Sequence, residues 1–282
     1  MATTFFNRAT LTYDGVTRQS NTVTGTIESG LTVTKTALTP DYTAGAEKTF
    51  VINLTNNATS DFEGLTLTDD LGAYAFNQTT LTPLTYTAGS VNYSVNGVQQ
   101  AAPGVTAGPP LVFTGVSVPA GGNAAVIYKA AVNQYAPLGS GAEITNTVTV
   151  TGGAMTTPVT ASATITADDA PQLTITKSVT PAVVTENGQL TYTFVIENNG
   201  STAADATDDV SVGDTFDPVL SSLTVQLNGA ALTPTTDYTY ASGVFATVPG
   251  VITVPAATQT QSPTGEWISI PGESVLTVTG TV

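Results

Sequence analysis

The sequence predicts an all-β protein: two tandem immunoglobulin-like antiparallel β-sandwich domains preceded by an N-terminal donor β-hairpin. Short runs alternate between apolar and polar residues, as in residues 31–37 (LTVTKTA), and this is the period of a half-buried strand. The runs recur between clusters of Gly, Pro, Asn and Asp, which are turn signals typical of a sandwich. The chain also contains two copies of one pattern in the same order.

Composition supports this class and excludes several functions. The 282 residues carry a formal net charge of -15, which disfavours nucleic acid or an anionic membrane as a partner. The sequence has no Cys and no His, which excludes disulfides, thiolate or imidazole metal sites and Ser-His-Asp catalysis. We therefore expect no cofactor, no metal and no enzyme acting on other molecules; at most, the chain would react once with itself.

The internal repeat divides the chain. Residues 31–57 (LTVTKTALTPDYTAGAEKTFVINLTNN) correspond to residues 173–199 (LTITKSVTPAVVTENGQLTYTFVIENN). The run VSVPAGGNAAVIYKAAV, which ends at Val132, corresponds to ISIPGESVLTVTGTV, which ends at Val282. We predict a donor hairpin over residues 1–29, a complete sandwich over 30–168 and a second sandwich over 169–282.

The two copies differ at their ends. After Val132 the first copy continues with a strand, a turn and another strand, and the second copy has no such hairpin. Residues 5–27 precede the first copy and resemble its closing hairpin when Asn7 is aligned with Asn146. The order is therefore hairpin, domain with hairpin, domain lacking its hairpin.

A domain that lacks its last hairpin has unpaired backbone groups and an uncovered core. The N-terminal hairpin is suited to fill this edge in the next molecule, as in strand addition. A head-to-tail contact of this kind does not close, so it generates a fibre. The alternatives stay open: the hairpin packs locally on the first domain or is a flexible leader, or the chain is a truncated one.

The ordered set of runs LTVTKT, FVINLTNN, LTLTDDL, VSVPAGG and ITNTVTVTG resembles a conserved-repeat surface domain family, domain of unknown function 11. That resemblance implies a structural or stalk β-sandwich on a cell surface, with Lys–Asn isopeptide crosslinks like those of Gram-positive pilins and adhesins. It implies an intramolecular bond between Lys35 and Asn146 promoted by Asp69. In the second copy it implies Lys177 and Asp214, with Asn7 of the next subunit as the partner of Lys177.

Strand parity places these six residues on the same faces as their apolar neighbours. An unpaired inward Lys is costly, which favours a bonded or paired amine. Burial favours the neutral amine, and a protonated Asp would donate to the Asn carbonyl and shuttle protons while ammonia leaves. The alternatives are exposed lysines that limit edge pairing, or unbonded buried polar networks.

The leading hypothesis is a structural subunit of an extracellular filament whose partner is itself. We expect no membrane partner and no secretory signal within these residues, because the N-terminus lacks a basic region followed by an apolar run. A cell or spore surface is the expected location. The alternative is a monomeric stalk or adhesin that binds glycan or protein. Five aspartates between Asp205 and Asp217 are interpreted as solvated loop acids rather than a Ca²⁺ site.

Overall fold

A computed structural model describes residues 3–27, 30–153 and 155–282. Among these residues, the elements are strands apart from one 3-10 helix, η1 (Ala206–Asp208). No helix in this part of the chain is long and apolar enough to cross a membrane. The predicted all-β class is therefore confirmed.

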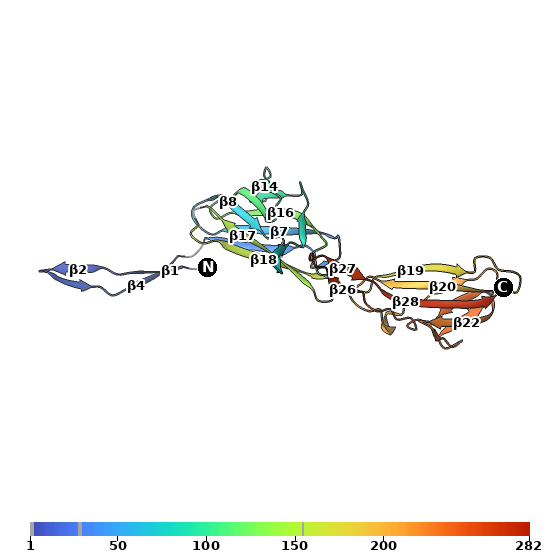
Figure 1. Ribbon diagram of the computed structural model, residues 1–282. Coiled ribbons are helices and arrows are strands. Elements are labelled where there is room, and N and C mark those ends of the chain that lie inside the picture. Colours follow the sequence, from blue (N-terminus) through green and yellow to red (C-terminus); the bar gives the residue numbers. More distant parts are fainter. Residues whose placement is uncertain (1–2, 28–29, 154) are drawn as a thin grey trace. The chain divides into compact units, whose positions relative to one another are not determined.

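Residues 3–27 form a two-stranded ribbon, called here the N-terminal ribbon (Figure 1). Strand β1 pairs with β4 and β2 pairs with β3, all antiparallel: β1 (Thr3–Asn7), β2 (Thr10–Tyr13), β3 (Val16–Gln19) and β4 (Val23–Ile27). The turn Asp14-Gly15 has φ of 45° and 75°, as the two-residue type I′ hairpin requires. All side chains from Thr4 to Thr24 are exposed.

Domain 1 consists of two antiparallel sheets. The first has the order β13-β12-β16-β7-β5, with β11 also paired to β16. Its strands are β5 (Leu31–Ala37), β7 (Glu47–Asn56), β11 (Leu84–Tyr86), β12 (Asn92–Val95), β13 (Val98–Gln99) and β16 (Asn123–Val132).

The second sheet of domain 1 has the order β14-β15-β8-β17-β18-β6. Its strands are β6 (Asp41–Tyr42), β8 (Phe62–Asp69), β14 (Gly104–Thr106), β15 (Leu111–Val118), β17 (Glu143–Thr151) and β18 (Val159–Ala167). A separate small hairpin joins β9 (Tyr74–Phe76) and β10 (Thr79–Leu81). Alternate residues of the long strands fill a core that includes Ile52, Leu67, Phe113 and Val126.

Domain 2 repeats the first sheet of domain 1. Its order is β19-β20-β28-β22-β23, from β19 (Leu173–Thr180), β20 (Gln189–Asn198), β22 (Ser221–Leu227), β23 (Ala230–Ala231) and β28 (Gly272–Thr281). The opposing sheet is smaller, with β21 (Gly213–Thr215), β24 (Tyr238–Ala241) and β25 (Val244–Thr247) in the order β21-β25-β24. A further hairpin pairs β26 (Thr258–Gln261) with β27 (Trp267–Ile270).

The chain forms two compact units, Met1–Tyr135 with Ile144–Ile165, and Ala136–Glu143 with Thr166–Val282. The predicted boundary after residue 29 adjoins residues 28–29, which lie outside the described residues. The predicted boundaries thus stay predictions.

The important difference between the domains lies in the second sheet. In domain 1, β8 pairs with β15 on one side and with β17 on the other. In domain 2, the corresponding strand β21 pairs with β25, and the described residues provide no counterpart of β17 and β18. One edge of the small sheet is therefore open in the described chain.

Candidate functional site

The polar site of domain 1 is assembled from four strands inside the sandwich. Lys35 on β5 donates from Nζ to Oδ2 of Asp69 on β8, at 2.7 Å, and both side chains are fully buried. The hydroxyl of Tyr128 on β16 donates to the same Oδ2 at 2.6 Å. Asn146 on β17 donates from Nδ2 to the Tyr128 hydroxyl at 2.9 Å. The alternation of each strand places these side chains on its inner face.

The structure thus brings Lys35, Asp69 and Asn146 into one network, as the sequence predicts. It differs in one respect, because Asp69 does not bond to the carbonyl of Asn146. Tyr128 lies between them, and Oδ1 of Asn146 is buried with no hydrogen-bond partner among the described residues. The other oxygen of Asp69 accepts from the backbone of Leu71 at 3.1 Å.

Burial governs the protonation of this network. Desolvation lowers the pKa of Lys35, and the charge and hydrogen bond of Asp69 oppose this shift only in part. The neutral form of the amine is therefore more favoured here than it is in water. Desolvation also raises the pKa of Tyr128 well above its ordinary value, so its phenol keeps its proton. The rings of Phe50 and Tyr128 lie 5.3 and 5.9 Å from Nζ of Lys35.

Domain 2 carries the corresponding site with one side missing. Lys177 forms an ion pair with Asp214, and its Nζ lies over the rings of Tyr192, Phe194 and Phe216 at 4.5, 5.5 and 5.5 Å. The amine therefore faces the core side of its sheet, yet its side chain is 40% exposed, against 0% for Lys35.

The apolar neighbours of Lys177 are uncovered as well. Leu173 and Ile175 are 38% and 53% exposed, whereas their counterparts Leu31 and Val33 are 3% and 8% exposed. The difference follows from the absence of a β17–β18 hairpin in the described part of domain 2. The inner face of β19 therefore presents uncovered apolar side chains beside a cation, and this uncovered face is called here the open groove.

The last predicted residue, Asn7, lies at the end of β1 in the N-terminal ribbon and is exposed. Parity predicts that Lys177 and Asn7 point inward; in the described chain neither is buried, because nothing covers β19 or the ribbon. Asn7 pairs with Val23 across the ribbon.

Tyr128 is the site residue that sequence reasoning missed. It occupies an ordinary apolar position of an alternating strand, so its hydroxyl gave no pattern to detect. Of the five aspartates between Asp205 and Asp217, Asp205 caps η1 and Asp208 completes the capping box, whereas Asp214 lies on β21 and pairs with Lys177. Among the described residues, no three Asp or Glu side chains gather as a metal site.

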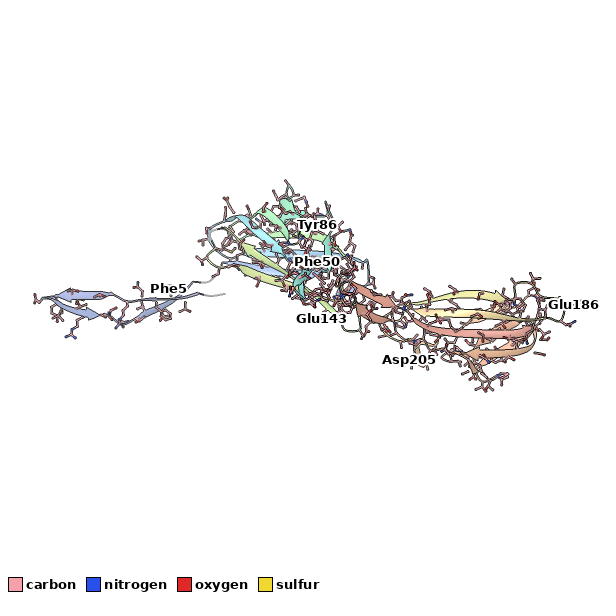
Figure 2. All side chains as sticks on the ribbon, in the orientation of Figure 1. Phe5, Phe50, Tyr86, Glu143, Glu186 and Asp205 are labelled. Carbon is pink, nitrogen blue, oxygen red and sulfur yellow. The ribbon has the colours of Figure 1, made fainter. Side chains whose placement is uncertain are left out.

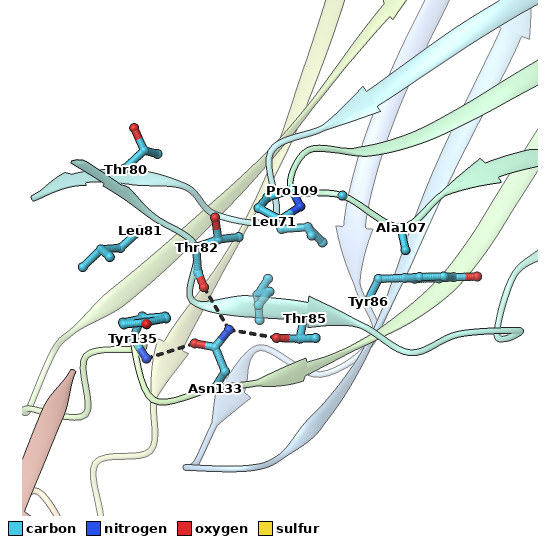
Figure 3. A pocket seen from close by; sticks show the side chains of 12 residues that line it. Leu71, Thr80, Leu81, Thr82, Thr85, Tyr86, Ala107, Pro109, Asn133 and Tyr135 are labelled. Atoms are coloured by element: carbon cyan, nitrogen blue, oxygen red, sulfur yellow. Dashed lines mark hydrogen bonds between the residues drawn. The ribbon is translucent and has the colours of Figure 1, made fainter. Parts of the chain in front are cut away.

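Domain 1 also has a pocket of about 380 Å³ beside β10 and β11 (Figure 3). The polar groups that line the pocket largely form hydrogen bonds with one another. Asn133 donates to the backbone oxygen of Thr82 and to Oγ1 of Thr85, at 2.8 and 2.9 Å, and accepts from the backbone of Tyr135. The side chains that line it include no charged group.

Comparison with known proteins gives distant structural matches only. No family model and no curated protein matches the sequence, so the resemblance to domain of unknown function 11 stays an expectation. BcpA, the major pilin subunit of Bacillus cereus, is 13% identical with a TM-score of 0.36, over 95% of this chain and 73% of the pilin. The pilus backbone RrgB of Streptococcus pneumoniae is 13% identical with a TM-score of 0.36, over 86% and 55%. The major pilin SpaD of Corynebacterium diphtheriae is 13% identical with a TM-score of 0.37, over 85% and 59%.

Proposed function

We propose that the protein is a structural subunit of an extracellular pilus-like filament on a cell or spore surface, and not an enzyme acting on other molecules. Subunits join head to tail when the N-terminal ribbon of one copy enters the open groove of the next. The observation that carries this proposal is the exposure of Leu173, Ile175 and Lys177 at positions that are buried in domain 1.

The ribbon carries exposed apolar side chains of the kind needed to cover the open groove. Leu11 lies opposite Arg18 and Tyr13 opposite Val16, so one face of the ribbon tip presents three apolar or aromatic side chains together with Arg18. The opposite face presents polar side chains, with Thr12 opposite Thr17. A two-stranded ribbon with an exposed apolar face is marginally stable alone and gains stability by packing on a sheet. Figure 2 shows its side chains, Phe5 among them, on both faces.

The register of domain 1 predicts how the ribbon docks. There, Val148 of β17 lies opposite Asp69, and the backbone N–H of Asp70 donates to Thr147 O at 2.9 Å. Alignment of Asn7 with Asn146 puts Ala9 opposite Asp214 in the joint. The counterpart of Asp70 is Thr215.

The backbone N–H of Thr215 now donates to Oδ1 of Asp214, at 2.9 Å. In the joint it donates to Arg8 O instead, as the N–H of Asp70 does to Thr147 O in domain 1. The ribbon thus adds a strand to the free edge of β21.

The arginines of the ribbon and the acidic residues of domain 2 are opposite in charge. The chain has two arginines, Arg8 and Arg18, and both lie in the ribbon. Residues 169–282 carry eleven Asp or Glu and one Lys, a formal charge of -10. Opposite charge steers the ribbon toward domain 2 of another copy. Only residues 28–30 separate the ribbon from β5, which favours another copy over the groove of the same chain. This contact is heterologous, so it extends as a fibre.

Lys–Asn bonds then seal the structure. Lys35 bonds to Asn146 within domain 1, and Lys177 bonds to Asn7 across the joint, promoted by Asp69 and Asp214. Docking buries Lys177 and brings the amide of Asn7 toward it. Proximity within a dry core supplies much of the rate.

The test is a denaturing gel of boiled protein, with mass spectrometry of the bands, on the wild type, Asn7→Ala and the control Asn21→Ala. A ladder in the wild type and control that collapses to monomer in Asn7→Ala is expected, with one ammonia lost per bond. A monomer band from material that is filamentous before boiling removes the covalent joint and keeps ribbon donation. A native monomer overturns the filament.

The pocket of domain 1 supports a second candidate, a monomeric stalk or adhesin module that binds glycan or protein. Threonine and tyrosine side chains at its rim, such as Thr80 and Tyr86, suit a sugar better than a charged ligand (Figure 3). A native monomer that binds immobilised glycans, and loses binding in Tyr86→Ala, is the result that favours this candidate.

A further inference from the structure

Tyr128 joins the two ends of the site in domain 1. Its hydroxyl donates to Oδ2 of Asp69 and accepts from Nδ2 of Asn146, at 2.6 and 2.9 Å. The same Oδ2 accepts from Nζ of Lys35 at 2.7 Å. A continuous hydrogen-bonded path therefore runs from the lysine amine to the amide nitrogen of Asn146, and every member of it is buried.

The ends of this path are the atoms that exchange protons in the proposed crosslink. The bond between Nζ of Lys35 and Cγ of Asn146 forms, and the bond between Cγ and Nδ2 breaks. The ammonium loses two protons in becoming an amide nitrogen, and the leaving Nδ2 gains one in becoming ammonia. An amide ion is a poor leaving group, so Nδ2 must receive a proton before it leaves. In a buried site this requires a proton path from the lysine ammonium to Nδ2.

We propose that Tyr128 is the proton relay to the leaving nitrogen, an inference that rests on the proposed Lys35–Asn146 crosslink. Asp69 takes a proton from the ammonium, and the neutral amine adds to Cγ. The phenol hydroxyl, which donates to Asp69 in the resting site, turns toward Nδ2. The protonated Asp69 then passes one proton to the phenol oxygen, the phenol proton moves to Nδ2, and ammonia leaves. The second proton from Nζ stays on Asp69, so the charges balance and Tyr128 ends as it began.

Domain 2 lacks this relay. Lys35 lies opposite Ile52, and two residues earlier Phe50 lies opposite Tyr128. Lys177 lies opposite Phe194, and two residues earlier Tyr192 lies opposite Val278. Val278 therefore occupies the position of Tyr128. The relay speeds closure of domain 1 relative to the joint, so each subunit is sealed internally before it is sealed to its neighbour.

The test follows intact mass over time in the full chain made by cell-free synthesis. All variants carry Asn7→Ala, so that the ammonia lost comes from domain 1, and peptide mapping identifies the Lys35–Asn146 link. Tyr128→Phe is expected to lose ammonia about a hundredfold or more slowly than its parent. Tyr93→Phe is the matched control, because it also removes a buried hydroxyl, one bonded to Ser117.

Equal rates in Tyr128→Phe and its parent overturn the relay. A parent that never loses ammonia overturns the crosslink itself, which is a separate outcome. A fluorinated tyrosine with a more acidic phenol, placed at position 128, keeps both hydrogen bonds and the fold. An altered rate with this residue is expected of a relay, whereas an unchanged rate reduces Tyr128 to a positioning role and overturns the proposal.

Discussion

Lys35 and Lys177 occupy the same position in two copies of one sheet, and each pairs with an aspartate, yet Lys35 is fully buried and Lys177 is 40% exposed. The difference between them is one hairpin. Domain 1 has β17 and β18 in its second sheet, and the described residues of domain 2 have no equivalent strands. The predictions below follow from that difference.

The apolar face of the ribbon is expected to drive assembly. Leu11→Asp replaces an apolar side chain of this face with a carboxylate opposite Arg18, and docking must then remove that charge from water, which is costly even for a paired charge. We expect no filaments by negative-stain electron microscopy and a monomer by light scattering. Thr12→Asp, on the opposite face, should assemble as the wild type does. Filaments of normal length from Leu11→Asp would contradict the proposed docking face.

Assembly is expected to slow with added salt. The ribbon carries both arginines and residues 169–282 carry a formal charge of -10, so screening weakens their long-range attraction. Turbidity or light scattering should show an initial rate that falls between about 50 and 500 mM NaCl, over which the Debye length shortens severalfold. Arg18→Glu should be slower still and less sensitive to salt. A rate that rises with salt would exclude electrostatic steering.

Loss of the domain 1 crosslink is expected to cost stability. A bond between Lys35 and Asn146 closes a loop of roughly a hundred residues, and the chain-entropy model for such loops gives about 4.7 kcal/mol. Asn146→Ala, made together with Asn7→Ala so that the joint releases no ammonia, should therefore unfold at a lower urea concentration than its Asn7→Ala parent, with its mass showing no loss of ammonia. Asn133→Ala, which removes a half-buried amide outside the network, serves as the control. A change of only about 1 kcal/mol, typical of one hydrogen bond, would mean that no covalent bond formed.

Alkaline pH is expected to destabilise the protein through Tyr128. Burial raises the pKa of this phenol above its ordinary value of 10.0, so the folded chain keeps a proton that the unfolded chain releases. Its contribution is therefore complete below about pH 10 and is lost as the pH rises further, by up to about 1.4 kcal/mol per pH unit. Urea unfolding of the wild type between pH 9 and 11 should show this loss.

Tyr128→Phe should show a smaller decrease over the same range. Tyr13→Phe, in the exposed ribbon, should follow the wild type. Parallel curves for the wild type and Tyr128→Phe would mean that the phenol does not carry the effect.

Much of the fold was predictable because alternation and repetition are local signals. The period of two in residues 31–37 fixes which residues of β5 face the core, and the same pattern in residues 173–180 identifies its counterpart. The structure reproduces this correspondence in its sheet orders. It also brings Lys35, Asp69 and Asn146 together, which follows from parity once the strands are placed.

The rest depends on contacts between strands distant in sequence. Nothing local distinguishes Tyr128 from any apolar residue of an alternating strand, and its role comes from two partners contributed by β8 and β17. The exposure of Lys177 was predictable only in part, because the missing hairpin indicated an uncovered core, whereas parity alone gives the direction of a side chain and not whether another layer covers it. Burial is a property of the assembled sheets.

The connection between the ribbon and β5 has a mechanical consequence. In the proposed filament, tension would enter domain 1 through Leu31, at the start of β5, and would meet Lys35 four residues later. With Lys35 bonded to Asn146, the load passes directly to β17. The segment between those two residues then bears no pull. Such a subunit resists extension without unfolding, because the load is borne by the residues outside the segment between Lys35 and Asn146.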